Sequence, residues 1–132
     1  MSPTSQLKSL RVVSSDSKKA AIRAFFKISE KWDLNNNEMI ALLGYPTEAT
    51  FYNWKKGVIR NVPHDTLERI SIVLGIFKAL EILYIQPELA DKWMKKPNSY
   101  FAGQSAMERM LAGSISDMAL VRSYLDSVRG GW

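Results

Sequence analysis

Apolar positions along the chain recur every three or four residues, which is the spacing of one face of an α-helix. The first such segment begins at Asp16 or Ser17, either of which can cap a helix, and continues to about Trp32. One stripe of this helix is expected to be buried: Ile22, Phe25, Phe26, Ser29 and Trp32. No segment alternates apolar and polar residues for long enough to predict a strand, so the pattern predicts an all-α fold.

The segment from Asn35 to Gly57 predicts two short helices joined by a tight turn. Asn35 and Glu38 have the three-residue spacing of a capping box, and Gly44 has the position at which a helix ends in the left-handed conformation. Thr47 can cap the second helix, which Gly57 ends after two lysines. Two short helices with a glycine-containing turn are typical of a helix-turn-helix unit.

The second of these helices has one bulky apolar face and one polar face when it is unrolled at about 100° per residue. Phe51 and Trp54 lie on the apolar face. On the polar face, Asn53 can pair with an adenine edge and Glu48 with a cytosine amino group. The candidate DNA-binding residues on this unit and the loop after it are Asn36, Asn37, Thr47, Glu48, Ala49, Tyr52, Asn53, Lys55, Lys56 and Arg60. The alternative is a helical hairpin that only builds core.

Proline, glycine and capping residues divide the rest of the chain into further helices. The first opens at Pro63, with Asp65 and Glu68 at capping-box spacing. Its nearly all-apolar run from Ile70 to Ile85 indicates burial on several sides, either in the core or in a dimer interface.

Three shorter helices are expected beyond this one. They run from Pro87 to a stop at Pro97, from a capping box at Ser105 and Glu108 to Gly113, and from Ser114 or Ser116 to Gly130. The inward positions of the last helix are predicted to be Ile115, Met118, Val121, Leu125 and Val128.

The charge of the chain is concentrated at one end. The 132 residues carry a net charge of +5, and residues 1–31 alone hold seven Lys and Arg against two acidic residues. Residues 1–15 are expected to form a flexible basic arm. Such an excess is typical either of a segment that follows a phosphate backbone or of a solubilising tail.

The residue inventory excludes several kinds of chemistry. The chain has no cysteine and one histidine, His64, so it cannot form a thiolate metal site or a Cys/His catalytic pair. It shows no nucleophile–base pair and no phosphate-cradling glycine loop, and we predict no enzyme activity and no cofactor. The longest apolar run, from Ile72 to Phe77, is too short to cross a bilayer. We therefore expect a soluble cytoplasmic protein without a membrane partner.

Five blocks in the second half of the chain resemble a known family: Trp93-Met94-Lys95-Lys96-Pro97-Asn98, Phe101-Ala102-Gly103, Gly113, Val121-Arg122-Ser123-Tyr124-Leu125-Asp126 and Arg129-Gly130-Gly131-Trp132. This half is similar to the toxin-binding domain of the Xre/MbcA/ParS antitoxins, and the segment 35–57 resembles their Xre-type helix-turn-helix. The likeness covers about two thirds of the chain and does not include residues 1–34. Ala102 stands where this family more often has glycine.

The resemblance implies a bacterial antitoxin with a division of labour. Residues 16–66 would bind operator DNA, dimerise and repress the operon, whereas residues 67–132 would hold a RES-domain toxin that degrades NAD or uses it for ADP-ribosylation. The complex would be a homodimer or a larger hetero-oligomer with the toxin. The residues implied to face the toxin are Arg122, Arg129, Gly130, Gly131 and Trp132. The alternative is a stand-alone helix-turn-helix regulator with a C-terminal dimerisation or partner-binding domain.

Overall fold

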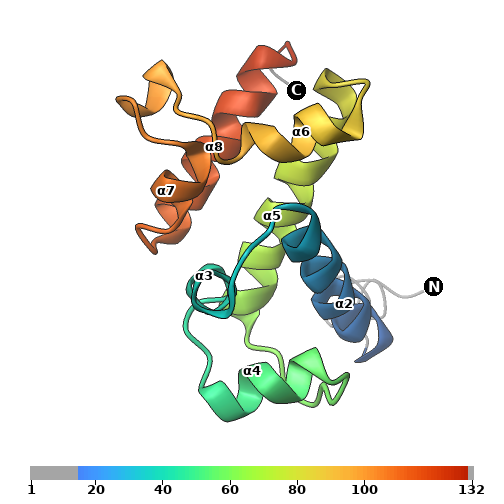
Figure 1. Ribbon diagram of the computed structural model, residues 1–132. Helices are drawn as coiled ribbons and strands as arrows, with labels where there is room; N and C mark the ends of the chain where they lie inside the picture. The colour runs from blue at the N-terminus through green and yellow to red at the C-terminus, as the bar shows by residue number, and fades with distance from the viewer. Residues whose placement is uncertain (1–14, 131–132) are drawn as a thin grey trace, which may run out of the picture.

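The computed structural model describes residues 15–130, and within that range it is built from helices arranged around one long central helix (Figure 1). In chain order the elements are α2 (Ser15–Lys31), α3 (Asn36–Leu42), α4 (Glu48–Lys55), α5 (His64–Leu83), α6 (Pro87–Trp93), the 3₁₀ helix η1 (Ser99–Phe101), α7 (Ala106–Met110) and α8 (Ile115–Val128). The described part of the chain has no strand, only an isolated bridge between Pro97 and Ser105. The all-α prediction is confirmed. The predicted arm, apart from Ser15, lies outside the described residues.

The central helix is α5, which packs against α2 on one side and against α8 and α6 on others. It buries Ile70, Val73, Ile76 and Leu80, each no more than 1% exposed. The prediction that this helix is buried on several sides is therefore confirmed. Because α2, α5 and α8 contribute to one continuous apolar cluster, the two halves of the chain share a core.

The stripe predicted for the first helix is buried with one exception. Ile22, Phe25 and Trp32 are at most 2% exposed, whereas Phe26 is half-buried and Ile28, two residues further along, is buried instead. Ser29 fits inside the apolar stripe because its hydroxyl donates to the carbonyl of Phe25 at 2.8 Å, which satisfies the buried oxygen.

The predicted capping of the two short helices is confirmed in atomic detail. The Glu38 amide donates to Oδ1 of Asn35 at 2.8 Å, and the Asn35 amide donates to Oε1 of Glu38 at 2.9 Å. Gly44 follows with φ of +89°, and the Thr47 hydroxyl accepts from the Thr50 amide to begin α4. The sequence did not indicate that Tyr45, beside the glycine, would also be left-handed, with φ of +61°.

Three details of the later helices differ from the prediction. Asp65 and Glu68 form no capping box, because α5 already begins at His64 and these carboxylates pair with Arg69 and His64 one turn away. Ile85 lies beyond the end of α5 and is 98% exposed. Val128, at the end of α8, is 53% exposed.

Candidate functional site

The short helix α4 presents one face to the core and one to solvent, as its sequence predicts. Phe51 and Trp54 are 0% and 3% exposed and hold the helix to the domain. Glu48, Ala49 and Asn53 are exposed on the other side, where they can reach an external ligand. The major groove of DNA admits an α-helix, so α4, held to the domain by its aromatic residues, can present this polar face to base edges.

A set of polar contacts ties α4 to the start of α3. The Lys55 ammonium donates to Oδ1 of Asn36 at 2.8 Å, and the Asn36 side-chain amide donates to the Tyr52 hydroxyl at 3.3 Å. The same ammonium lies 5.7 Å from the centre of the Phe51 ring. These contacts fix the orientation of Asn36 and Tyr52 relative to α4, so the three side chains form one preorganised surface.

The remaining predicted DNA-binding residues surround this surface. Asn37, Lys56 and Arg60 are exposed, Lys56 as the residue that caps the end of α4. The Thr47 hydroxyl is engaged in the cap of α4 and also donates to the Thr50 hydroxyl at 2.9 Å. The structure therefore brings all ten predicted residues to one end of the molecule, with Thr47 in a structural role as well.

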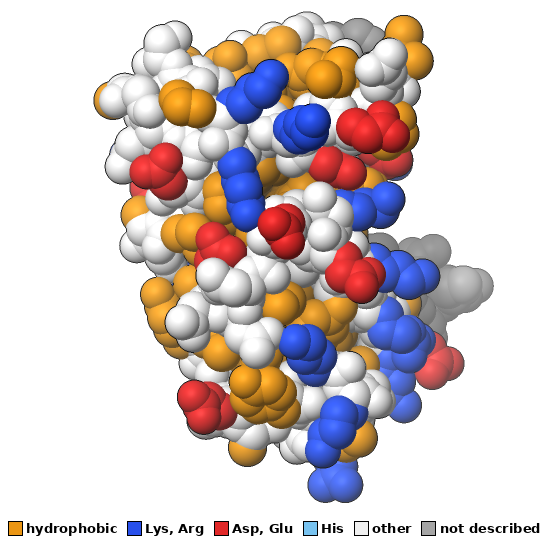
Figure 2. Space-filling view, in the orientation of Figure 1, with side chains coloured by type: hydrophobic (Ala, Val, Ile, Leu, Met, Phe, Trp, Pro, Cys, Tyr) orange, Lys and Arg blue, Asp and Glu red, His pale blue; other side chains and the backbone are white. Residues whose placement is uncertain are grey.

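Basic side chains extend this end of the molecule. Arg23, Lys27 and Lys31 are exposed along α2. Figure 2 shows Lys and Arg side chains gathered at its lower right, over α2 and α4. A positive surface next to a polar reading helix favours contact with a polyanion.

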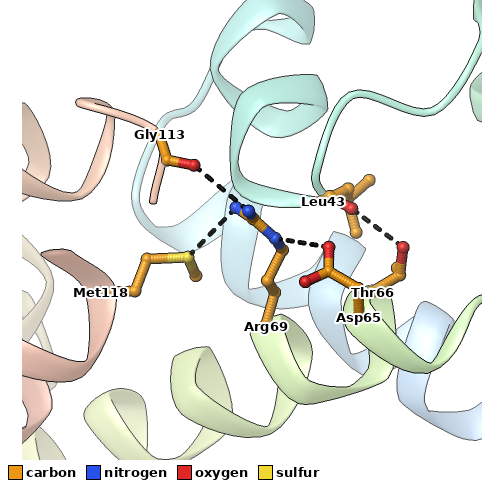
Figure 3. Close-up of polar contacts among 6 residues, drawn as sticks. All are labelled: Leu43, Asp65, Thr66, Arg69, Gly113 and Met118. Atoms are coloured by element: carbon orange, nitrogen blue, oxygen red, sulfur yellow. Dashed lines mark hydrogen bonds and ion pairs between the residues drawn. The ribbon is translucent and has the colours of Figure 1, made fainter. Parts of the chain in front are cut away.

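Arg69 joins this end of the molecule to the C-terminal helices (Figure 3). It is only 9% exposed, and its Nε donates to Oδ2 of Asp65 at 2.9 Å, while a terminal nitrogen donates to the Gly113 carbonyl at 3.2 Å. A second nitrogen lies 3.8 Å from the sulfur of Met118 on α8. One guanidinium thus connects α5 with the loop before α8.

The neighbouring turn is built closely against the same arginine. The Thr66 hydroxyl donates to the Leu43 carbonyl at 3.0 Å, which satisfies the end of α3 (Figure 3). A Cβ at Gly44 would lie 2.8 Å from Oδ2 of Asp65 and 3.0 Å from Nε of Arg69. Thr66 and Arg69 were not predicted from the sequence; the signal that could have indicated them is the polar pair Asp65 and Arg69, one helical turn apart in an otherwise apolar helix.

The residues predicted to face a partner lie on and after α8. Arg122 lies across α5 where Gly75 has no side chain, and a Cβ there would be 2.5 Å from the guanidinium carbon of Arg122. Its Nε is 3.9 Å from Asp126, which also pairs with Arg129 at 3.8 Å. The missing side chain at Gly75 therefore leaves the space that the guanidinium of Arg122 occupies.

Gly130 ends α8 with φ of +109° and is exposed. The predicted residues Gly131 and Trp132 lie outside the described residues. The structure therefore brings Arg122 and Arg129 together around Asp126.

Four aromatic rings hold the end of α6, the 98–103 loop and α8 together. Tyr124 is stacked on Trp93 with ring centres 6.2 Å apart, and it contacts Tyr100 at 4.3 Å and Phe101 at 5.5 Å. Phe101 is 4% exposed and Tyr100 is 55% exposed. Ala102 adopts φ of +57°, so this loop keeps the left-handed turn that a glycine would take more readily.

The described residues contain neither a membrane-spanning helix nor a cluster of metal ligands. None of the helices in residues 15–130 is long and apolar enough to cross a membrane. Over the same range no three His, Asp or Glu side chains come together as metal ligands.

Two family models match this chain, one in its N-terminal half and one in its C-terminal half. Residues 11–75 match the family model described as the antitoxin Xre-like helix-turn-helix domain. Residues 79–131 match that of the antitoxin Xre/MbcA/ParS C-terminal toxin-binding domain. The chain is also 47% identical over 120 residues to "Uncharacterized protein y4oB" of Sinorhizobium fredii (strain NBRC 101917 / NGR234), covering 89% of this chain and 92% of that protein.

Proposed function

The chain belongs to the Xre/MbcA/ParS family of antitoxins, and from this premise we propose that it blocks a RES-domain toxin and represses its own operon. The toxin would be an NAD-consuming enzyme, and the complex would be assembled in the bacterial cytoplasm around a dimer of this chain. The observation that carries the proposal is the division of one compact chain into a basic end with a polar reading helix and a separate toxin-binding half.

For the DNA-binding half we propose residues 16–66, with α4 lying in the major groove. Asn53 and Glu48 would contact base edges, and Tyr52 and Ala49 would pack beside them. Lys56 and Arg60, together with Asn36, Asn37, Thr47 and Lys55 at the helix starts and ends, would approach the backbone phosphates. The exposure of Asn53 and Glu48 supports this assignment.

For the toxin-binding half we propose residues 67–132, with α5 shared between the two halves. Arg129, Gly130, Gly131 and Trp132 would reach toward the toxin, and Arg122 would support them. An arginine fork suits carboxylates and phosphate-binding clefts, and a tryptophan beside glycines can bury a large area in a pocket. Asp126 supports this reading because it holds the two arginines on one side of α8.

The test is growth rescue with a reporter for repression. Cells that express a RES-domain toxin from the same host are expected to recover growth and NAD when this chain is co-expressed. The chain is also expected to lower expression from its own promoter. A chain that represses the promoter but leaves cells sensitive to the toxin would instead be a stand-alone regulator, and the proposal would be wrong.

A further inference from the structure

Exposed aliphatic side chains gather where α5 meets α6. Ile82 is 59% exposed, Leu89 is 44% exposed and Ile85, in the short connection between the helices, is 98% exposed. We call these three residues the α5–α6 corner. The other large hydrophobic residues that are exposed within 15–130 are spread over the helix-turn-helix end, the 98–103 loop and the end of α8. A grouped set of exposed apolar side chains is typical of an interaction surface, whereas single ones are ordinary.

A hollow lies directly beside the corner. Its volume is about 160 Å³, and its walls combine the apolar residues Phe77, Tyr84, Ile85 and Pro87 with the carboxylates Glu81 and Asp91. A protein cavity of about 150 Å³ accommodates a benzene ring, so this hollow can take one apolar side chain of a partner. The corner therefore combines protruding aliphatic groups with a place that can receive one.

The charges around the corner are of both signs. Residues 79–91 contain Glu81, Glu88 and Asp91 and no Lys or Arg, but exposed lysines border this segment on both sides, Lys78 one helical turn before Ile82 and Lys92 directly after Asp91. Lys31 also lines the hollow, and its ammonium lies 5.9 Å from the Phe77 ring centre. Figure 2 shows hydrophobic, acidic and basic side chains together at its upper right, where Figure 1 places the end of α5 and the start of α6. Because the surface has no excess of positive charge, it suits a protein partner with an apolar centre better than it suits DNA.

The position of the corner identifies which partner that is. It lies within residues 79–131, which match the toxin-binding domain, and outside residues 11–75, which match the helix-turn-helix domain. It is also at the opposite end of α5 from α4 (Figure 1), and a helix of 20 residues is about 30 Å long. We propose that the α5–α6 corner is part of the toxin interface and receives an apolar side chain of the toxin.

This inference rests on the proposed function and extends it. It adds a second contact region, separate from residues 129–132. Because the corner and α4 are at opposite ends of α5, a toxin bound there leaves the DNA-reading face open, so toxin and operator can be bound by one antitoxin chain at the same time.

The experiment measures binding of full-length variants to an inactivated RES-domain toxin by isothermal titration calorimetry. Ile85→Glu places a carboxylate at the centre of the corner, and we expect binding at least about tenfold weaker. Ile85→Leu keeps the apolar character and should bind as the wild type does. Val58→Glu is the matched control, because Val58 is 42% exposed at the helix-turn-helix end and should leave toxin binding unchanged. Circular dichroism checks that each variant is folded, and light scattering of the free chains gives their oligomeric state.

Each outcome decides the question. Weaker toxin binding by Ile85→Glu, with an unchanged oligomeric state, supports the inference. Equal binding by the variant and the wild type overturns the inference and leaves the proposed function intact. If Ile85→Glu instead dissociates a dimer of the free chain, the corner is a contact between copies and the inference is wrong. A wild-type chain that binds no RES-domain toxin overturns the proposed function and this inference together.

Discussion

Replacing Arg69 by methionine tests whether one buried guanidinium joins the helix-turn-helix end to the C-terminal helices. Methionine keeps most of the apolar volume next to Met118, so the main loss is the hydrogen bonds to Asp65 and to the Gly113 carbonyl. The side chain of Asp65 is 54% exposed, and solvent screening therefore limits the ion pair to less than about 1 kcal/mol. A hydrogen bond from a charged donor to a carbonyl contributes about 1.5–3 kcal/mol.

These terms predict that Arg69→Met lowers the free energy of unfolding by about 2–3 kcal/mol. For a chain of this size the melting temperature should fall by about 6–15 °C. Urea and thermal unfolding, followed by circular dichroism, measure both quantities.

The matched control is Arg109→Met. Arg109 is 42% exposed and pairs with Asp117 at 3.1 Å within the α7–α8 region alone. Its replacement should cost less than about 1 kcal/mol. An Arg69→Met variant whose unfolding free energy stays within about 0.5 kcal/mol of the wild type would refute the claim that this arginine joins the two regions.

The remaining predictions concern DNA, the turn and the toxin. Asn53→Ala should weaken operator binding by about 1–3 kcal/mol and relax sequence preference at one base pair, as measured by fluorescence anisotropy on operator variants. Lys55→Ala should weaken binding to all sequences alike and reduce the slope of log affinity against log salt by about one; unchanged binding by both variants would show that α4 is not the reader. Gly44→Ala should destabilise the chain by about 1–3 kcal/mol in urea unfolding, because φ is +89° and the new Cβ would crowd Asp65; equal stability would contradict this. Deleting residues 129–132 should abolish growth rescue while promoter repression persists, and rescue by the truncated chain would remove these residues from the toxin interface.

Local structure was predictable where one side chain satisfies one backbone group. The capping box at Asn35 and the caps at Thr47 and Ser105 are determined by residues three positions apart, and each is present. The buried face of α4 was also predictable, because the helical period places Phe51 and Trp54 on the same side of the helix and both are buried.

Prediction was weaker where distant segments decide the outcome. Asp65 and Glu68 have capping-box spacing, but the carboxylate of Asp65 binds Arg69 because that guanidinium is fixed by Gly113, 44 residues further along the chain. Ile85 was expected to continue a buried face, and its exposure depends on where α6 turns away. The aromatic contacts of Tyr124 likewise join three segments that no local pattern relates.

The two candidate surfaces differ in the same way in how far the sequence could predict them. All ten residues proposed to bind DNA come from one continuous segment, so a local motif was enough to gather them. The α5–α6 corner depends on the turn between two helices, and only the structure shows that its aliphatic side chains are left uncovered.

The most direct test of the account is to recover this chain from its native host under gentle conditions and identify what accompanies it by mass spectrometry. The proposed function predicts one RES-domain protein in a fixed ratio to this chain, retained after nuclease treatment. Recovery of this chain alone, or with DNA and no such protein, would contradict the antitoxin–RES pairing that the proposal requires.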